Sequence, residues 1–97
     1  MRYAIEQTEV FSKWHQSLRD LRARFAIARR IERAALGNLG DAKPVREGLS
    51  ELRVDVGAGY RVYFTVRGAA IIFLLCGGDK SSQEADIKRA LKMLKEI

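Results

Sequence analysis

The amino-acid sequence predicts a small α+β domain, in which two N-terminal helices and one C-terminal helix pack on a mostly antiparallel sheet. Apolar residues recur at helical spacing in residues 8–36 and again after residue 81. They alternate with polar residues over residues 49–67, and they form an unbroken run over residues 69–76. No linker-like stretch divides the 97 residues, so we expect a single domain over 1–97 with the order β-α-α-β-β-β-α.

Basic residues outnumber acidic ones, with 18 Lys and Arg against 12 Asp and Glu, and the net charge is +6 at pH 7. A surplus of this sign favours an anionic partner, either a nucleic acid or an acidic protein. The single cysteine, Cys76, excludes an intramolecular disulfide and suits a reducing compartment. Because the N-terminus lacks a signal-peptide pattern and the longest apolar run is too short for a bilayer, we expect a cytoplasmic protein without membrane contact.

Two consecutive helices are predicted after a short first strand over residues 2–6. Thr8 suits the N-cap of the first helix, whose apolar residues follow at helical spacing: Phe11, Trp14, Leu18 and Leu21. Asp20 marks the break before a second helix of about residues 22–36, which Gly37-Asn38 ends. Its arginines suit either a solvated face or a footprint for phosphate or an acidic partner: Arg22, Arg24, Arg29, Arg30 and Arg33. Residues 39–45, which contain the only proline, are expected to form a loop.

A β-hairpin is predicted next, with Gly57-Ala58-Gly59 as its turn. A three-residue loop would set Val56 opposite Tyr60, Arg53 opposite Tyr63, and Asp55 opposite Arg61. The hairpin then has one apolar face, while the other face carries Arg53, Arg61 and Tyr63.

The last strand and the last helix follow directly. The apolar run Ala69–Cys76 predicts a strand that is covered on both faces. Gly77-Gly78 is expected to form a tight turn, and Ser81-x-x-Glu84 matches a capping box that opens the final helix.

The chemistry that the sequence offers is a cationic face. One histidine, His15, and one cysteine give no metal-ligand spacing, so we expect neither a metal nor a cofactor. Arg53, Arg61 and Lys80 are placed to bind phosphate and to stabilise charge that develops on it. Tyr63 could stack on a base, and Asp86, in the first turns of the last helix, could move a proton. The alternative is that Arg53 and Arg61 form ordinary cross-strand ion pairs with Asp55 and Glu51.

A set of motifs that covers nearly the whole chain resembles the RelE/ParE toxin superfamily, and within it the HigB-like branch. The motifs are Phe11-x-x-Trp14, Gly37-Asn38-x-Gly40-Asp41, Gly48-Leu49-Ser50-Glu51-Leu52-Arg53, Gly59-Tyr60-Arg61-Val62-Tyr63 and Gly77-Gly78-Asp79-Lys80-x-x-Gln83-x-x-Asp86-Ile87-x-x-Ala90.

This resemblance implies the toxin of a type II toxin–antitoxin module, a metal-independent endoribonuclease that cuts mRNA on the ribosome and leaves a 2′,3′-cyclic phosphate. It implies that Arg61 stabilises the transition state, that Lys80 supports the scissile phosphate, and that Arg53 serves positioning or proton transfer. Asp86 stands where RelE has an aromatic residue, so Tyr63 or Asp86 would move the proton. The residues expected to contact RNA are Lys43, Tyr63 and Gln83.

The implied partners are mRNA, the ribosome and a cognate antitoxin of the helix-turn-helix, HigA-like type, with operator DNA bound only through that antitoxin. Two alternatives stay open at this point. One is a ParE-like inhibitor of DNA gyrase without nuclease activity. The other is a noncatalytic module that binds RNA or protein.

Overall fold

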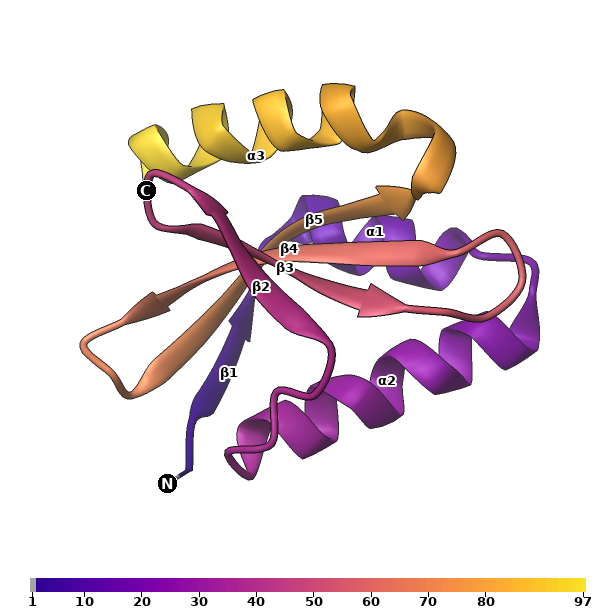
Figure 1. Ribbon diagram of the computed structural model, residues 1–97, viewed down its shortest axis with the longest axis horizontal. Helices are drawn as coiled ribbons and strands as arrows, with labels where there is room; N and C mark the ends of the chain where they lie inside the picture. Colours follow the sequence, from indigo (N-terminus) through magenta and orange to yellow (C-terminus); the bar gives the residue numbers. More distant parts are fainter. Residues whose placement is uncertain (1) are drawn as a thin grey trace.

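Five strands and three α-helices make up the computed structural model, which describes residues 2–97 (Figure 1). The elements in chain order are β1 (Ala4–Gln7), α1 (Glu9–Ser17), α2 (Leu21–Ala35), β2 (Ala42–Arg46), β3 (Leu49–Val54), β4 (Tyr60–Arg67), β5 (Ile71–Asp79), a 3₁₀ turn η1 (Lys80–Ser82) and α3 (Gln83–Glu96). The strands form one sheet in the order β1-β5-β4-β3-β2, in which only β1 and β5 are parallel. The predicted α+β class is confirmed.

Strand β2 corrects the prediction of a loop over residues 39–45. It pairs only with β3, so it is an edge strand, and its ladder is irregular between Pro44 and Arg46. An edge is where a sheet tolerates proline, because the missing N–H would otherwise leave a ladder bond unmade. The strand sets Lys43 opposite Glu51 on β3.

Both N-terminal helices begin at side-chain caps, of which Thr8 was predicted as a cap and Asp20 as the break between the helices. The Thr8 hydroxyl accepts a hydrogen bond from the backbone N–H of Phe11 at 3.0 Å, and the Asp20 carboxylate accepts one from that of Ala23 at 3.3 Å. Gly37 follows α2 with a φ of 97°, the left-handed conformation expected after a helix. These short-range signals are read correctly from the sequence because their hydrogen bonds join residues three positions apart.

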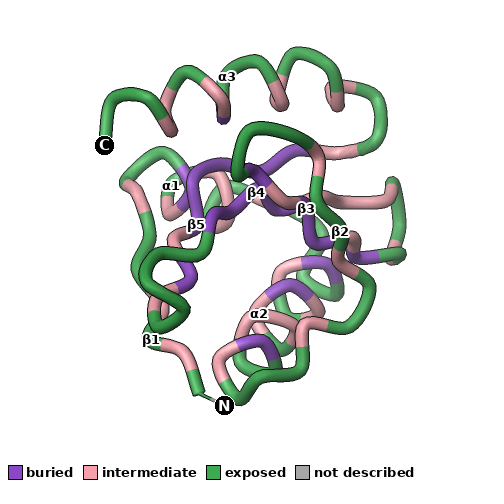
Figure 2. The backbone as a smooth tube through the Cα atoms, turned by 60° about the vertical axis from the view of Figure 1, so that its left-hand side comes forward, coloured by how far each residue is buried: buried purple, intermediate pink, exposed green. Residues whose placement is uncertain are grey.

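The sheet has a separate hydrophobic core on each face. On one face α1 and α2 bury side chains such as Phe11 and Ile27 against Val62 and Leu74. On the other face α3 buries Ala90 against a smaller set: Leu49, Tyr63, Leu75 and Cys76. Figure 1 shows α3 on one side of the sheet and α2 on the other, and Figure 2 shows the buried positions of the helices turned inward. The helices therefore sandwich the sheet.

The register of the β3–β4 hairpin differs from the predicted one by two residues. Val54 pairs with Tyr60 and Arg53 pairs with Arg61, so that residues 55–59 form a longer loop than expected. A shift of two residues keeps every side chain on its predicted face, because side chains alternate along a strand with a period of two. The shift nevertheless changes the neighbours: Arg53 lies opposite Arg61, and Tyr63 lies opposite Glu51.

Gly77 and Gly78 lie within β5, where they pair with Val62 and Arg61, and do not form the predicted turn. A Cβ atom on Gly77 would overlap the Trp14 ring, and one on Gly78 would overlap an Asp86 carboxylate oxygen. Glycine is therefore required because α1 and α3 approach the strand closely from opposite faces.

The predicted capping box at the start of the last helix is wrong. The chain first makes the turn η1, in which the Asp79 carboxylate accepts a hydrogen bond from the Ser81 backbone N–H at 2.8 Å. The Ser81 hydroxyl donates to the same carboxylate oxygen, and this hydrogen bond together with that of the Ser81 backbone N–H lowers the pKa of Asp79. The N-cap of α3 is Ser82, whose hydroxyl donates to the Asp86 carboxylate at 2.5 Å and makes no capping bond.

Candidate functional site

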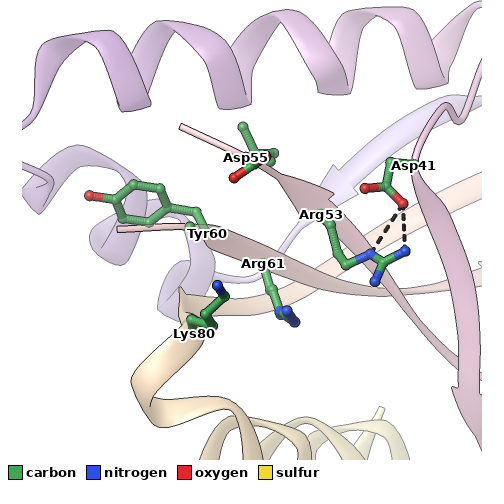
Figure 3. Close-up of a pocket in the computed structure, with 8 residues that line it drawn as sticks. Asp41, Arg53, Asp55, Tyr60, Arg61 and Lys80 are labelled. Atoms are coloured by element: carbon green, nitrogen blue, oxygen red, sulfur yellow. Dashed lines mark hydrogen bonds and ion pairs between the residues drawn. The ribbon is translucent and has the colours of Figure 1, made fainter. Parts of the chain in front are cut away.

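A pocket of about 290 Å³ opens beside the β3–β4 hairpin, on the side of the sheet where η1 begins (Figure 3). Its lining includes three cationic and two anionic side chains together with the start of β4: Asp41, Arg53, Val54, Asp55, Gly59, Tyr60, Arg61 and Lys80. The three cations on which the sequence analysis relied, Arg53, Arg61 and Lys80, therefore lie at one site. Their catalytic roles stay predictions.

Three connections in the backbone bring these cations together. The antiparallel register sets Arg53 directly opposite Arg61, and both side chains emerge on the face that α3 partly covers. On the other side of β4, Arg61 pairs with Gly78 of β5. The backbone N–H of Lys80 donates to the carbonyl oxygen of Gly59 at 2.9 Å, which ties η1 to the hairpin loop.

Arg53 is held by Asp41, which precedes the edge strand. Its Nε and Nη2 atoms donate to the same Asp41 carboxylate oxygen at 3.1 and 2.8 Å. Both side chains are well exposed, at 38% and 53%, so water competes for this pair and a phosphate could displace the carboxylate at small cost. Arg30 of α2 supports the backbone here, because its guanidinium donates to the carbonyl oxygens of Arg53 at 2.6 Å and Leu39 at 3.1 Å.

Arg61 has a buried partner. Its Nη1 atom lies 3.4 Å from Oε2 of Glu51, and the two side chains are only 14% and 2% exposed. Gln83, the first residue of α3, donates to the other oxygen of Glu51 at 3.4 Å. The alternative of cross-strand ion pairs is thus correct for Arg61 with Glu51, whereas Arg53 pairs with neither Glu51 nor Asp55 but with Asp41.

Tyr63 corrects a predicted RNA contact. Its side chain is fully buried in the core beneath α3, so it cannot stack on a base. Among residues 2–97, its hydroxyl is the buried side-chain polar atom that has no hydrogen-bond partner. Burial, followed by the nearby carboxylates of Glu51 and Asp86, raises the pKa of this phenol, so the phenol stays protonated at neutral pH.

The other predicted site residues lie around the pocket and do not line it. Asp86 packs over Gly78 and accepts a hydrogen bond from Ser82, an arrangement that fits a structural role better than the predicted proton transfer. Lys43 is exposed on edge strand β2, which β3 separates from the strand of Arg61, and the side chain of Gln83 donates to Glu51. Of the predicted RNA contacts, Lys43 therefore has the freest side chain.

Sequence reasoning missed Asp41 as the partner of Arg53. Asp41 belongs to a segment without periodicity. Nothing in the sequence shows that this segment continues into a strand, β2, whose pairing with β3 places Asp41 beside Arg53. Glu51 was detectable, because it alternates on the same face as Arg53 and was the partner in the ion-pair alternative. In Figure 3 the ring of Tyr60 lines the pocket while its hydroxyl points away from Arg53 and Arg61.

The arrangement can bind a phosphate group. Lys80 is exposed and forms no ion pair within the part of the chain that the structure describes, whereas Arg53 and Arg61 present guanidinium groups that match phosphate geometry. No group of three or more His, Cys, Asp and Glu side chains among residues 2–97 could hold a metal ion. Within the same range, no helix combines the length and apolar character needed to span a membrane.

The fold is similar to that of RelE toxins of known structure. An arginine-to-alanine double mutant of the E. coli toxin RelE in the free state matches with a TM-score of 0.77 and 18% identity, over 96% of this chain and 98% of that chain. A chain of the toxin–antitoxin complex RelBE2 from Mycobacterium tuberculosis matches at 0.66 and 18% identity, over 82% and 100%. A chain of the archaeal RelE–RelB complex from Pyrococcus horikoshii matches at 0.56 and 21%, over 82% and 97%.

The particular family follows from the sequence. Residues 9–95 match the family model described as Phage derived protein Gp49-like (DUF891), so the chain belongs to this family. An uncharacterised protein of Haemophilus influenzae is 45% identical over 97 residues, which is 100% of this chain and 98% of that protein. The narrower resemblance to the HigB-like branch stays a prediction.

Proposed function

We propose that this protein is the toxin of a type II toxin–antitoxin module and acts as a metal-independent endoribonuclease on mRNA. The observation that carries the proposal is the convergence of Arg53, Arg61 and Lys80 in one pocket of a RelE-like fold. The partly covered cationic pocket suits a single phosphate group of a flexible strand better than a flat duplex surface.

The proposed reaction is an internal transesterification. The ribose 2′-oxygen forms a bond to the adjacent phosphorus, the bond from phosphorus to the 5′-oxygen breaks, and a 2′,3′-cyclic phosphate is left. One proton leaves the 2′-hydroxyl and one reaches the departing 5′-oxygen. Asp41 and Asp55 are the pocket carboxylates that can accept the first proton, and the Lys80 ammonium can supply the second.

Arg61 is the proposed transition-state stabiliser. Its guanidinium binds the extra negative charge that develops on the phosphate, and Glu51 holds that guanidinium in place from the buried side. Arg53 positions the phosphate once it exchanges Asp41 for the ligand. Lys43 extends the cationic surface along the edge strand toward the rest of the RNA.

The proposed partners are those expected of the toxin of a toxin–antitoxin module. Two similar structures are complexes of RelE-type toxins with their antitoxins, which supports a cognate antitoxin for this chain. We expect a helix-turn-helix protein of the HigA type that carries the operator-DNA contact. We expect mRNA to be cut in the cytoplasm on the ribosome, as the HigB-like resemblance implies.

The test is primer extension on mRNA in a translating extract. Wild type should create new 5′ ends, and Lys80→Ala and Arg61→Ala should each lower cleavage at least tenfold, since one transition-state donor is worth about 3 kcal/mol. Arg67→Ala is the matched control, because Arg67 lies at the far end of β4 over the Phe73 ring. An absence of new ends, together with loss of gyrase supercoiling, would replace the nuclease with the gyrase inhibitor.

A further inference from the structure

A second cationic groove lies on the opposite side of the hairpin end from the pocket of Arg61. It has a volume of about 480 Å³ and runs between α2 and the end of β3, lined by Arg22, Phe25, Ala26, Arg29, Arg30, Arg33, Val54, Asp55 and Val56. It shares only Val54 and Asp55 with the first pocket. The proposed cleavage reaction uses none of its arginines directly.

The arginines of this groove form a stripe on the outside of α2. Arg22, Arg29 and Arg33 follow one another at helical spacing on a face distinct from the buried face of Ala23, Ile27 and Ala34. Eleven residues of helix span ~16 Å. The side chains of Arg22, Arg29 and Arg33 form no hydrogen bond or ion pair within residues 2–97, and Asp55 is the one carboxylate in the lining. The stripe is therefore a row of available cations.

The floor of the groove is apolar. Phe25 is 67% exposed in the middle of the arginine stripe, the largest exposed fraction among the exposed large hydrophobic residues of residues 2–97. Ala26, Val54 and Val56 continue this apolar surface between α2 and the hairpin. Aromatic and arginine side chains around an apolar centre are the composition of protein–protein interfaces. A phosphate backbone would not need the aliphatic floor.

We propose that this groove docks an acidic amphipathic helix of a partner protein. Leucine-like side chains of that helix would cover Phe25 and Val56, and its carboxylates, spaced like the arginines, would pair with Arg22, Arg29 and Arg33. Assigning the helix to the antitoxin rests on the proposed function, whereas the docking itself rests only on the groove. Because Arg30 also holds the Arg53 carbonyl, an occupant would lie against the support of the first pocket.

The experiment measures binding of a labelled helical peptide by fluorescence anisotropy at physiological salt. The probe is an Ala-, Leu- and Glu-based peptide of about 16 residues, ~24 Å long as a helix, with one leucine face flanked by glutamates. Arg29→Glu with Arg33→Glu should weaken binding at least tenfold. Lys88→Glu with Lys92→Glu makes the same charge change on α3 and should weaken it less than twofold.

A second pair of variants tests the apolar floor. Phe25→Ala should weaken peptide binding about fivefold, whereas Leu36→Ala, which removes the 61% exposed side chain of the residue after α2, outside the groove, should not. All of these side chains are exposed, so folding is checked by circular dichroism and should be retained.

Three outcomes would overturn the docking proposal. The peptide fails to bind, the two charge-reversal variants lose affinity equally, or a single-stranded RNA of similar length displaces the peptide from the arginine stripe. Concentration-dependent dimerisation that Phe25→Ala abolishes would assign the groove to a second copy of this chain instead. Failure of the nuclease test with intact peptide binding would reject the proposed enzyme and leave the groove unaffected.

Discussion

Arg61 on β4 and Glu51 on β3 are diagonal neighbours, with Nη1 and Oε2 separated by 3.4 Å and side chains that are only 14% and 2% exposed. The other ion pair at this site, between Arg53 and Asp41, is shorter at 2.8 Å but exposed. The two arginines are direct neighbours in the register and yet have opposite freedom to change partners. The buried pair holds Arg61 in place, as its proposed role as transition-state stabiliser requires, and the exposed pair leaves Arg53 free to accept a ligand.

The two pairs should contribute very differently to stability. Glu51→Gln leaves a largely buried guanidinium without its counter-charge, and we expect it to lower the free energy of unfolding by about 3 kcal/mol. Asp41→Asn should lower it by less than ~1 kcal/mol, as is typical of exposed pairs. Urea unfolding of both variants measures the difference. Equal effects would mean that the buried pair has no special role.

Tyr63→Phe should leave the fold and the activity intact. The hydroxyl is buried and has no partner within the described residues, so its removal relieves a desolvated polar group. We expect the free energy of unfolding to be unchanged or to rise by up to ~1 kcal/mol. Urea unfolding and the mRNA cleavage assay measure the two quantities. A tenfold loss of cleavage with an unchanged fold would restore Tyr63 as a functional residue.

The raised pKa of Tyr63 predicts a loss of stability at high pH. Burial keeps the phenol neutral in the folded chain, whereas in the unfolded chain it ionises near pH ~10. The stability that the neutral phenol contributes is therefore complete below that pH and is lost as the pH rises toward the pKa of the phenol in the folded chain. Between about pH 9 and 11 the urea midpoint of wild type should fall more than that of Tyr63→Phe. If the urea midpoints of the two proteins fell equally over this range, the prediction would be wrong.

The face of the sheet on which each side chain of the β3–β4 hairpin lies was predictable from the sequence, but its neighbour on the opposite strand was not. Alternation places Arg53, Arg61 and Tyr63 on one face for any register of the correct parity, and that expectation holds. The loop length decides which residues are opposite, and no local signal in Gly57-Ala58-Gly59 shows that five residues are needed. The burial of Tyr63 depends on α3 packing over this face, which is a tertiary contact.

The same limit applies to the glycines before the last helix. Gly77-Gly78 has the composition of a turn, and only the packing of α1 and α3 shows that both belong to a strand. Asp41 reaches Arg53 only through the unpredicted edge strand. The Thr8 cap and the helix break at Asp20 were predicted correctly because each signal is complete within one turn of chain.

Gly78→Ala should destabilise the fold through Asp86. The new methyl group would overlap the Asp86 carboxylate, and we expect a loss of about 2 kcal/mol or more. Adding Asp86→Ala should recover part of this loss, so that the two substitutions are not additive in urea unfolding. Gly68→Ala is the matched control, because no atom lies within 4 Å of its Cβ position and only its φ of 58° opposes alanine. Additive losses would show that Gly78 and Asp86 do not interact.

Asp41→Asn should tighten RNA binding, because it releases Arg53 from its exposed partner. The cost of opening that pair is at most ~1 kcal/mol, which corresponds to about fivefold in affinity. The probe is a short RNA with a 2′-deoxy sugar at the cleavage position, so that binding is measured without reaction. In wild type Arg53 exchanges one anion for another, so that its phosphate contact releases no net counterion. In the variant the same contact releases one, and the slope of log affinity against log salt should steepen by ~0.7.

The control is Asp55→Asn, which removes a pocket carboxylate that forms no ion pair within residues 2–97. It changes the net charge equally but releases no arginine, so its salt slope should stay that of wild type. Adding Arg53→Gln to Asp41→Asn should abolish the gain, because the released group is then missing. If Asp41→Asn and Asp55→Asn tighten binding equally with the same salt slope, Arg53 does not exchange Asp41 for phosphate. The proposed positioning role of Arg53 would then be wrong.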